Sequence, residues 1–320
     1  MPEASGALPD LAAIRAACER IAPHVHRTPV MTCASIDAEV GATLAFKCEN
    51  LQRIGAFKAR GACNAVFALA DPVARRGVVT HSSGNHGAAL AYAAKRRGIP
   101  AFVVMPENAP KVKQDNVARF GATIRFCAAN VAAREAACTE VQSTTGATLI
   151  HPFDNEDVIA GQGTTALELL EQTAGVDIVI APCGGGGLLS GAAIAATSVQ
   201  DGVRVYGAEP ANAGDAAASF RSGRIEPLPP TMTIADGLRT SLSPRTFAAI
   251  RAHVAAFGVC SEEAIVRAMR MMFERMKIVV EPSAAVPLAC LLERTLDVAG
   301  ARVGIIISGG NVDLDHLPWQ

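Results

Sequence analysis

Short apolar segments recur between residues 43 and 307, separated by longer segments whose apolar residues follow helical spacing. The apolar segments lack the polar alternation of a half-exposed strand, which is typical of parallel sheets covered on both faces. We therefore predict strands over residues 43–48, 77–80, 101–105, 123–127, 148–151, 177–182, 203–208 and 303–307.

The segments between these strands are predicted to be helical. Asp10 can cap a first helix that runs to about Ile21. A second helix is expected over 58–70 and is ended by Asp71-Pro72. Further helices are expected from the turn after residue 81 to Arg97, over 111–120, 131–145 and 161–173, after Gly187 and after Ser261. This alternation over 320 residues favours an α/β fold with two mostly parallel sheets. The irregular segment 221–245 is long enough to suggest a functional role.

Composition narrows the classes of function. Half of the residues are hydrophobic, 18% are charged and the formal net charge is −1, so no basic surface for nucleic acid is expected. No run reaches the roughly 18 consecutive apolar residues of a membrane helix, and the N-terminus lacks a basic segment before an apolar run. Nine cysteines without a Cys-x-x-Cys pair indicate free thiols in a reducing compartment. We expect a cytoplasmic protein.

Lys58 stands within Phe-Lys-Ala-Arg-Gly. Small and apolar neighbours make it a poor surface charge and a candidate amine nucleophile that loses its proton in a protected pocket. Taken alone, this lysine fits an ordinary solvated charge more often than a nucleophile. Further segments of the chain favour the nucleophile.

Residues 82–87 read Ser-Ser-Gly-Asn-His-Gly and lie between a predicted strand and a predicted helix. Such a junction presents free backbone N–H groups and the positive end of the helix dipole. The hydroxyl, amide and imidazole side chains add donors, so the segment is a candidate anion site. The alternative is an ordinary capped turn.

Residues 183–187 read Cys-Gly-Gly-Gly-Gly, again after a strand and before a helix. Consecutive glycines let several amides approach one phosphate. The run fits neither the Gly-x-Gly-x-x-Gly dinucleotide fingerprint nor a Walker A loop, so a phosphate monoester fits better. A flexible linker is the alternative. Ser308 directly follows the last predicted strand, where a hydroxyl faces the ligand crevice of a parallel sheet. The alternative for Ser-Gly-Gly-Asn is an ordinary turn of an α/β fold.

Glu209 ends another predicted strand, and Asp215 follows six residues later. Two carboxylates and a backbone carbonyl suit a hard cation such as Mg²⁺ or Ca²⁺. Solvated loop carboxylates are the alternative.

Taken together, these segments resemble the fold-type II pyridoxal 5′-phosphate (PLP) enzymes. The most similar branch contains serine/threonine dehydratases (ammonia-lyases), serine racemases and 3-hydroxyaspartate dehydratases. The resemblance covers nearly the whole chain, and its motifs keep the family's order: His26-Arg27-Thr28-Pro29, Phe57-Lys58-Ala59-Arg60-Gly61, 82–87, His151-Pro152-Phe153-Asp154, Gly161-Gln162-Gly163-Thr164, Gly184–Gly187, Ala235-Asp236-Gly237, Glu281-Pro282-Ser283 and Ser308-Gly309-Gly310-Asn311.

The resemblance implies a tryptophan synthase β-like fold of two intertwined α/β domains, each with an open, mostly parallel sheet covered by helices. The large, cofactor-binding domain would take residues 1–76 and 150–320, and a small, mobile domain would be inserted over 77–149. A homodimer is expected. Ala56 stands where many members carry serine. That serine is not essential to the bond between lysine and cofactor, so the role expected of Lys58 is unaffected. The chain stops shortly after Asn311, so the regulatory domain of biosynthetic threonine dehydratases, and feedback by isoleucine, are not expected.

The resemblance also assigns the cofactor contacts. Lys58 would bond covalently to the PLP aldehyde, with Phe57 packed beside it. Asn85 would pair with the phenolic oxygen and Ser308 with the pyridine nitrogen. A hydroxyl there does not enforce a charged ring, which favours loss of a β-substituent over a persistent carbanion. The phosphate would lie on Gly184, Gly185, Gly186 and Gly187.

The remaining assignments concern substrate and metal. Ser83 matches the acid/base on the face opposite the lysine. The α-carboxylate of the substrate would be held by Ser82, Gly84 and His86. A cation site, for Mg²⁺ or alternatively Ca²⁺ or Mn²⁺, would be formed by Glu209, the carbonyl of Ala213 and Asp215.

The expected reaction is β-elimination on a 3-hydroxy amino acid, which yields a 2-oxo acid and ammonia. Arg134 or Arg239 could bind a distal carboxylate, which would favour 3-hydroxyaspartate over serine or threonine; both could equally be surface arginines. A serine racemase is the nearest alternative, and β-replacement of the cysteine-synthase type fits the motifs less well. The alternative from another class is a non-catalytic protein that binds a phosphorylated metabolite through its glycine loops.

Overall fold

The computed structural model of the protein describes residues 7–82, 84–109 and 111–320. Its larger sheet has six strands and is parallel apart from the pairing of its first two strands. The strand order is β1 (Val30–Met31), β2 (Thr43–Cys48), β10 (Arg302–Ile307), β7 (Ile178–Pro182), β8 (Arg204–Pro210) and β9 (Ala256–Cys260).

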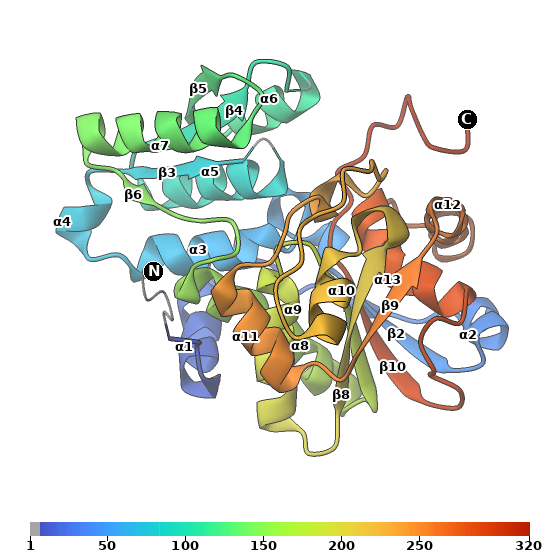
Figure 1. Ribbon diagram of the computed structural model, residues 1–320. Helices are drawn as coiled ribbons and strands as arrows, with labels where there is room; N and C mark the ends of the chain where they lie inside the picture. Colours follow the sequence, from blue (N-terminus) through green and yellow to red (C-terminus); the bar gives the residue numbers. More distant parts are fainter. Residues whose placement is uncertain (1–6, 83, 110) are drawn as a thin grey trace.

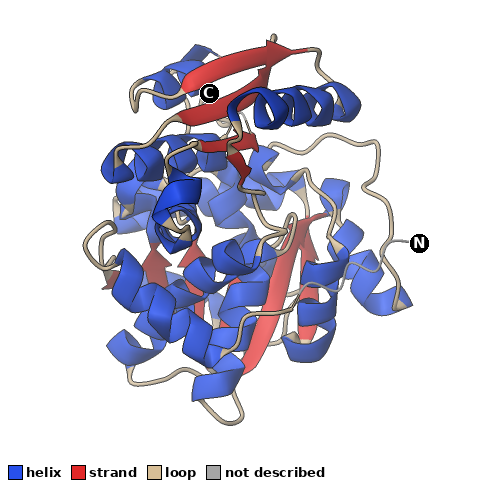
Figure 2. Ribbon diagram, turned by 90° about the vertical axis from the view of Figure 1, so that its left-hand side faces the viewer, coloured by secondary structure: helices blue, strands red, loops and turns tan. Residues whose placement is uncertain are grey.

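The smaller sheet has four parallel strands and lies to one side of the larger sheet (Figures 1 and 2). Its order is β5 (Thr123–Cys127), β4 (Ala101–Pro106), β3 (Val78–His81) and β6 (Thr148–Leu149). Nearly every residue of β3 and of the central strands of the larger sheet is buried, as expected for sheets covered on both faces.

Helices cover both faces of the larger sheet with two separate apolar cores. One face carries α2 (Ala34–Val40), α12 (Glu262–Met271) and α13 (Pro282–Leu292). The other face carries α1 (Leu11–Ile21), α8 (Glu156–Thr173), α9 (Gly187–Val199), α10 (Asp215–Ser222) and α11 (Pro244–His253).

The smaller sheet is covered by α5 (Asn85–Arg97) and α6 (Lys111–Ala118) on one face and by α7 (Val131–Thr145) on the other. Helix α3 (Lys58–Ala68) packs between α5 and α8 and so connects the two halves. Its contact with α8 needs glycine on both sides, because a Cβ on Gly161 would lie 2.6 Å from the Cα of Gly61. Shorter turns of helix are α4 (Asp71–Ala74), η1 (Glu49–Leu51), η2 (Arg53–Gly55), η3 (Ala211–Ala213), η4 (Asp236–Leu238) and the π-helical turn η5 (Met272–Met276).

The predicted fold class and all eight predicted strands are confirmed. Helix α3 ends at Ala68, before Asp71-Pro72 as predicted. Asp71-Pro72 then begins the short helix α4, which was not predicted, because proline is well accommodated in a first helical turn. One prediction was wrong in detail. Helix α8 begins at Glu156, five residues before the predicted start, because Asn155 caps it through the Val158 amide.

Several elements were not predicted, among them α2, α10, α11, α13 and β9. The smaller sheet lies inside the segment predicted as the small domain, whose mobility stays a prediction. All nine cysteines are free thiols, and within the described residues no helix is both long and apolar enough to cross a membrane.

Candidate active site

Lys58 begins α3, and its amine donates to the carbonyl of Pro152 at 2.8 Å. Part of the side chain remains accessible. Burial of the amine lowers the pKa of Lys58 to about 8, although the Glu281 carboxylate opposes that shift. At pH 7 about a tenth of the amine is therefore unprotonated, far more than for a lysine of ordinary pKa, and this unprotonated form is the nucleophile.

The backbone just before Lys58 is held by the segment that follows β10. The Phe57 amide donates to the carbonyl of Ser308 at 3.0 Å, and Ala56 forms an isolated antiparallel bridge with Gly309. Ser308 itself is 3% exposed. The predicted strand-end serine and the predicted lysine therefore lie on adjoining segments, although they are 250 positions apart.

Arg60, two residues after Lys58, is fully buried in a network of charges. It makes two hydrogen bonds of 2.8 Å to Glu49 and two of 2.8 Å to Glu168. The fully buried Lys47 also donates to Glu168, at 2.6 Å. These bidentate pairs fix the first turn of α3, because Arg60 cannot turn without giving up its hydrogen bonds to both carboxylates.

The segment that leads from β6 to α8 covers the glycine run. The Phe153 ring occupies the space that a side chain at position 185 would need, because a Cβ on Gly185 would lie 2.4 Å from it. The Nδ1 atom of His151 accepts from the Asp154 amide at 2.9 Å, and burial lowers the pKa of His151 to about 4. His151 is therefore neutral at physiological pH.

Gly184–Gly187 connect β7 to α9, as predicted. Gly186 has a φ of +84° and precedes the first turn of α9, and no side chain caps that turn. The N–H groups at this helix end are therefore available for an anion.

A second uncapped helix end lies at α5. Gly84 precedes the helix without a side-chain cap, and its amide meets the Oγ atom of Ser82 at 3.3 Å. His86 is 2% exposed, its Nε2 atom meets the Ile150 carbonyl at 3.1 Å, and burial keeps its pKa well below the usual value. The predicted Ser83 lies outside the described residues.

Glu281 is a residue of the site to which the sequence assigned no role. Its carboxylate is 6% exposed and accepts from the Nδ2 atom of Asn85 at 2.9 and 3.1 Å. It lies at the start of α13, where the helix dipole stabilises a negative charge. An acidic residue directly before Pro282 was the available signal, since proline favours the first helical position.

The two predicted arginines differ in position. Burial lowers the pKa of His81, and the charge of Arg134 on α7 lowers it further; the His81 ring packs edge-on against His151 at 5.3 Å. Arg239 is exposed and donates to the Thr233 carbonyl at 2.9 Å. No described contact links Arg239 to the surroundings of Lys58.

Glu209 and Asp215 are 0% and 2% exposed. Glu209 accepts from the amides of Ala216 and Ala217 at 3.2 and 2.7 Å, whereas neither carboxylate oxygen of Asp215 has a hydrogen-bond partner among the described residues. Burial raises the pKa of Asp215 to about 6. Burial and the nearby Asp215 raise the pKa of Glu209.

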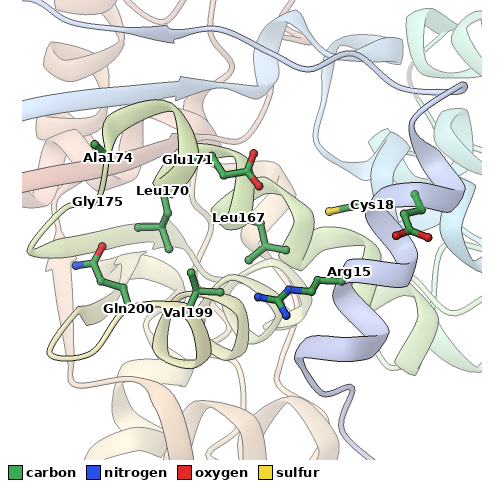
Figure 3. A pocket seen from close by; sticks show the side chains of 10 residues that line it. Arg15, Cys18, Leu167, Leu170, Glu171, Ala174, Gly175, Val199 and Gln200 are labelled. Atoms are coloured by element: carbon green, nitrogen blue, oxygen red, sulfur yellow. The ribbon is translucent and has the colours of Figure 1, made fainter.

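A groove of about 500 Å³ lies elsewhere on the molecule, between α1, α8 and the end of α9 (Figure 3). Ala174 and Gly175, which line it, precede β7, so the groove lies at the amino end of the strand. The glycine run follows the carboxyl end of β7, where ligands of parallel sheets bind. None of the predicted site residues lines this groove.

The arrangement around Lys58 combines a desolvated amine with two uncapped helix ends. An aldehyde that carries a phosphate fits it, because the amine can attack the aldehyde while one helix end holds the phosphate. The second helix end can hold a carboxylate. The half-buried amide of Asn85 and the buried hydroxyl of Ser308 lie around the same space.

Comparison with known proteins agrees with this chemistry. The family model described as pyridoxal-phosphate dependent enzyme matches residues 21–309. The chain is 50% identical over 323 residues to serine racemase from Oryza sativa, covering 99% of this chain and 95% of that protein. It is 48% identical over 305 residues to β-hydroxyaspartate dehydratase from Paracoccus denitrificans, covering 95% and 97%. The structure of maize serine racemase superposes with a TM-score of 0.94 at 50% identity, covering 97% and 95%.

Proposed function

The chain belongs to the family of pyridoxal-phosphate-dependent enzymes, and we propose that it is an ammonia-lyase acting on a 3-hydroxy amino acid. The β-hydroxyl leaves as water, and hydrolysis of the released enamine gives a 2-oxo acid and ammonia. Serine, threonine and 3-hydroxyaspartate are the candidate substrates. The observation that carries the proposal is the Lys58 amine, which is desolvated and directed at the Pro152 carbonyl beside the glycine run.

When bound, pyridoxal phosphate supplies an electron-withdrawing ring that stabilises negative charge on the α-carbon of an amino acid. Lys58 would bond to the cofactor, and its freed amine would remove the α-proton. The backbone N–H groups of Gly184–Gly187 would hold the phosphate, and Phe57, Asn85 and Ser308 would contact the ring.

The N-terminus of α5 is proposed to hold the α-carboxylate of the substrate. Ser82 and the backbone amides from Gly84 to His86 are the donors. His86 would contribute its backbone amide and not its imidazole, because the ring is buried and its Nε2 atom meets the Ile150 carbonyl. Arg134 would meet a distal carboxylate, as in 3-hydroxyaspartate.

Amino-acid racemisation is a second candidate function, and the relatives named serine racemase support it. Racemisation needs an acid on the face of the α-carbon opposite Lys58, a role proposed for Ser83. Chiral analysis of serine after incubation separates the two functions: a racemase forms D-serine, whereas a lyase forms only pyruvate and ammonia.

We propose that Glu209, Asp215 and the carbonyl of Ala213 hold a divalent cation, Mg²⁺ or alternatively Ca²⁺ or Mn²⁺. Two neighbouring buried carboxylates are costly without a counter-charge, and the oxygens of Asp215 have no partner among the described residues. No group of three or more acidic, histidine or cysteine side chains in the described residues could hold a metal, so carbonyl and water oxygens would complete the ligand set.

The test begins with the purified protein and pyridoxal phosphate. An absorbance band at ~410–420 nm in the loaded protein, absent from Lys58→Ala, is expected. A protein that never acquires the band with added cofactor would contradict catalysis and favour a non-catalytic phosphometabolite-binding protein. A panel of 3-hydroxy amino acids scored for 2-oxo acid release, with and without EDTA, then identifies the substrate and the metal requirement.

Two further properties are proposed. A cytoplasmic location fits nine free thiols. A homodimer is the commonest assembly of such enzymes, and light scattering of the purified protein tests it.

A further inference from the structure

We infer that Glu281 and Asn311 are positioning residues that fix the orientation of the Asn85 amide toward the cofactor site. This inference rests on the proposed function, because it concerns how Asn85 meets the ring of pyridoxal phosphate. Three side chains from three segments make the arrangement: Asn85 begins α5, Glu281 precedes α13 and Asn311 follows β10.

A carboxamide can be turned over, which exchanges its donor and its acceptor at no covalent cost. Here each end of the Asn85 amide meets a group of fixed character. An ionised carboxylate only accepts, so the Nδ2 atom must face Glu281, at 2.9 and 3.1 Å. The opposite end meets a donor, because the Nδ2 atom of Asn311 lies 2.8 Å from the Oδ1 atom of Asn85.

Asn311 is itself held in one orientation. Its Nδ2 atom also donates to the carbonyl of Ile54 at 2.8 Å. A carbonyl only accepts, so the nitrogen of Asn311 must stay where it is. Asn311 therefore donates to both Ile54 and Asn85, and Asn85 in turn donates to Glu281, so each group in this row of hydrogen bonds has one fixed role.

The same arrangement leaves one donor of Asn85 for a ligand. Both contacts of its Nδ2 atom go to oxygens of one carboxylate, and one N–H can serve both. The second N–H then points away from Glu281 and can donate to an oxygen of the cofactor. A turned amide would present a carbonyl oxygen instead and would repel an anionic oxygen.

Glu281 also acts on Lys58 directly, since its negative charge raises the pKa of that amine. The other titratable groups that face Lys58 are His86 and His151, both held neutral by burial. The carboxylate thus has two separable effects, one through charge on Lys58 and one through a hydrogen bond on Asn85.

Two substitutions separate these effects. Glu281→Gln removes the charge but keeps an acceptor for Asn85, whereas Glu281→Met removes both. In the cofactor-free protein, both variants should lower the Lys58 pKa, measured by the pH dependence of trace acetylation of that amine. At a pH above the Lys58 pKa, Glu281→Met should bind pyridoxal phosphate about tenfold more weakly than Glu281→Gln.

Asn311→Asp replaces the donor by an acceptor of the same shape and should also weaken cofactor binding. In an Asn85→Ala background, Glu281→Met and Glu281→Gln should differ by less than about twofold, because there is no amide left to orient. The matched control is the pair Glu262→Met and Glu262→Gln, a carboxylate in the first turn of α12 that contacts the Ile234 amide. Neither control should change the Lys58 pKa or cofactor affinity.

Equal cofactor affinities for Glu281→Met and Glu281→Gln, or a difference that persists without Asn85, would overturn the inference. An unchanged Lys58 pKa in both variants would overturn the effect of charge. Circular dichroism of each variant establishes that it is folded. A wild-type protein that binds no pyridoxal phosphate would instead contradict the proposed function, while the acetylation measurement would still report on Glu281 and Lys58.

Discussion

The amine of Lys58 and the carbonyl of Pro152 are 2.8 Å apart, and the two residues lie on the two segments that connect the larger sheet with the smaller one. Lys58 begins the helix that lies between the two halves, and Pro152 lies on the segment that leads from β6 back to α8. The nucleophile is therefore held by a backbone acceptor that a side-chain substitution does not remove.

The lowered pKa of Lys58 predicts a pH dependence for cofactor binding. Only the neutral amine attacks an aldehyde, so the association rate of pyridoxal phosphate should rise with pH and level off above about 8. Stopped-flow absorbance across that range measures the rate. An unperturbed lysine would give a rate that still rises up to about pH 10, and that profile would contradict the burial of the amine.

The sign of the accompanying stability effect follows from the same shift. In the unfolded chain Lys58 has its ordinary pKa of 10.5, above the value of about 8 in the folded protein. Between these values the unfolded state binds more protons, so the Lys58 contribution to the free energy of unfolding should increase with pH. Lys58→Met should lose this increase in urea titrations of the cofactor-free protein.

Replacement of Arg60 should destabilise the fold strongly. Arg60→Met leaves the buried Glu49 and Glu168 without their bidentate partner, which should cost about 3–5 kcal/mol of unfolding free energy. Urea unfolding measures the loss. The matched control is Arg27→Met, which breaks an exposed ion pair with Glu171 and should cost less than about 1 kcal/mol. Similar losses in the two variants would contradict the importance of the buried network.

The proposed cation site predicts a response to chelation. With Mg²⁺ at about a hundred times its dissociation constant, the Tm should exceed that in EDTA by about 5 °C. Asp215→Asn should abolish the difference, whereas Asp201→Asn, on an exposed carboxylate, should keep it. Equal Tm values for the wild-type protein with and without EDTA would contradict the site.

The metal-free protein should also show a distinct pH dependence. The pKa of Asp215 is raised from 3.8 to about 6, so the folded state holds a proton that the unfolded state has lost. The free energy of unfolding should therefore fall as pH rises between these values, and the buried Glu209 contributes with the same sign. In Asp215→Asn this fall should be reduced.

The positions of the two arginines predict different effects on substrate choice. The charge of Arg134 acts on His81, whose ring packs against His151, whereas Arg239 is held by the Thr233 carbonyl. Arg134→Ala should lower the ratio of kcat/KM for 3-hydroxyaspartate to that for serine by about tenfold or more. Arg239→Ala should leave the ratio unchanged, and the opposite result would exchange their roles.

The sequence was sufficient for those parts of the fold that rest on local patterns. Val303–Ile307 or Ile178–Pro182 are apolar throughout and can hardly be anything but buried strands. Helix α13 was missed because it is apolar on all sides and contains Pro287, so it has no amphipathic period. Strand β9 contains Phe257-Gly258, a short pattern that propensity alone does not resolve.

The site was predictable where residues are adjacent in sequence and not where the fold assembles them. The run Gly184–Gly187 is recognisable from the sequence, because few structures need four glycines between a strand and a helix. For Glu281 the sequence signals only the start of a helix before Pro282, since its role depends on Asn85, which is 196 positions away. The carbonyl of Pro152 cannot be predicted from residue type at all, because every residue has one.

The contact of Phe153 with Gly185 and Gly187 makes these positions dependent on one another when the sequence changes. A Cβ on Gly185 or on Gly187 would come within 2.4 or 2.9 Å of Phe153. Alanine at Gly185 is therefore tolerable only after the aromatic side chain has been shortened. In a directed-evolution library, gain of a side chain at Gly185 should be recovered together with loss of Phe153, and seldom before it.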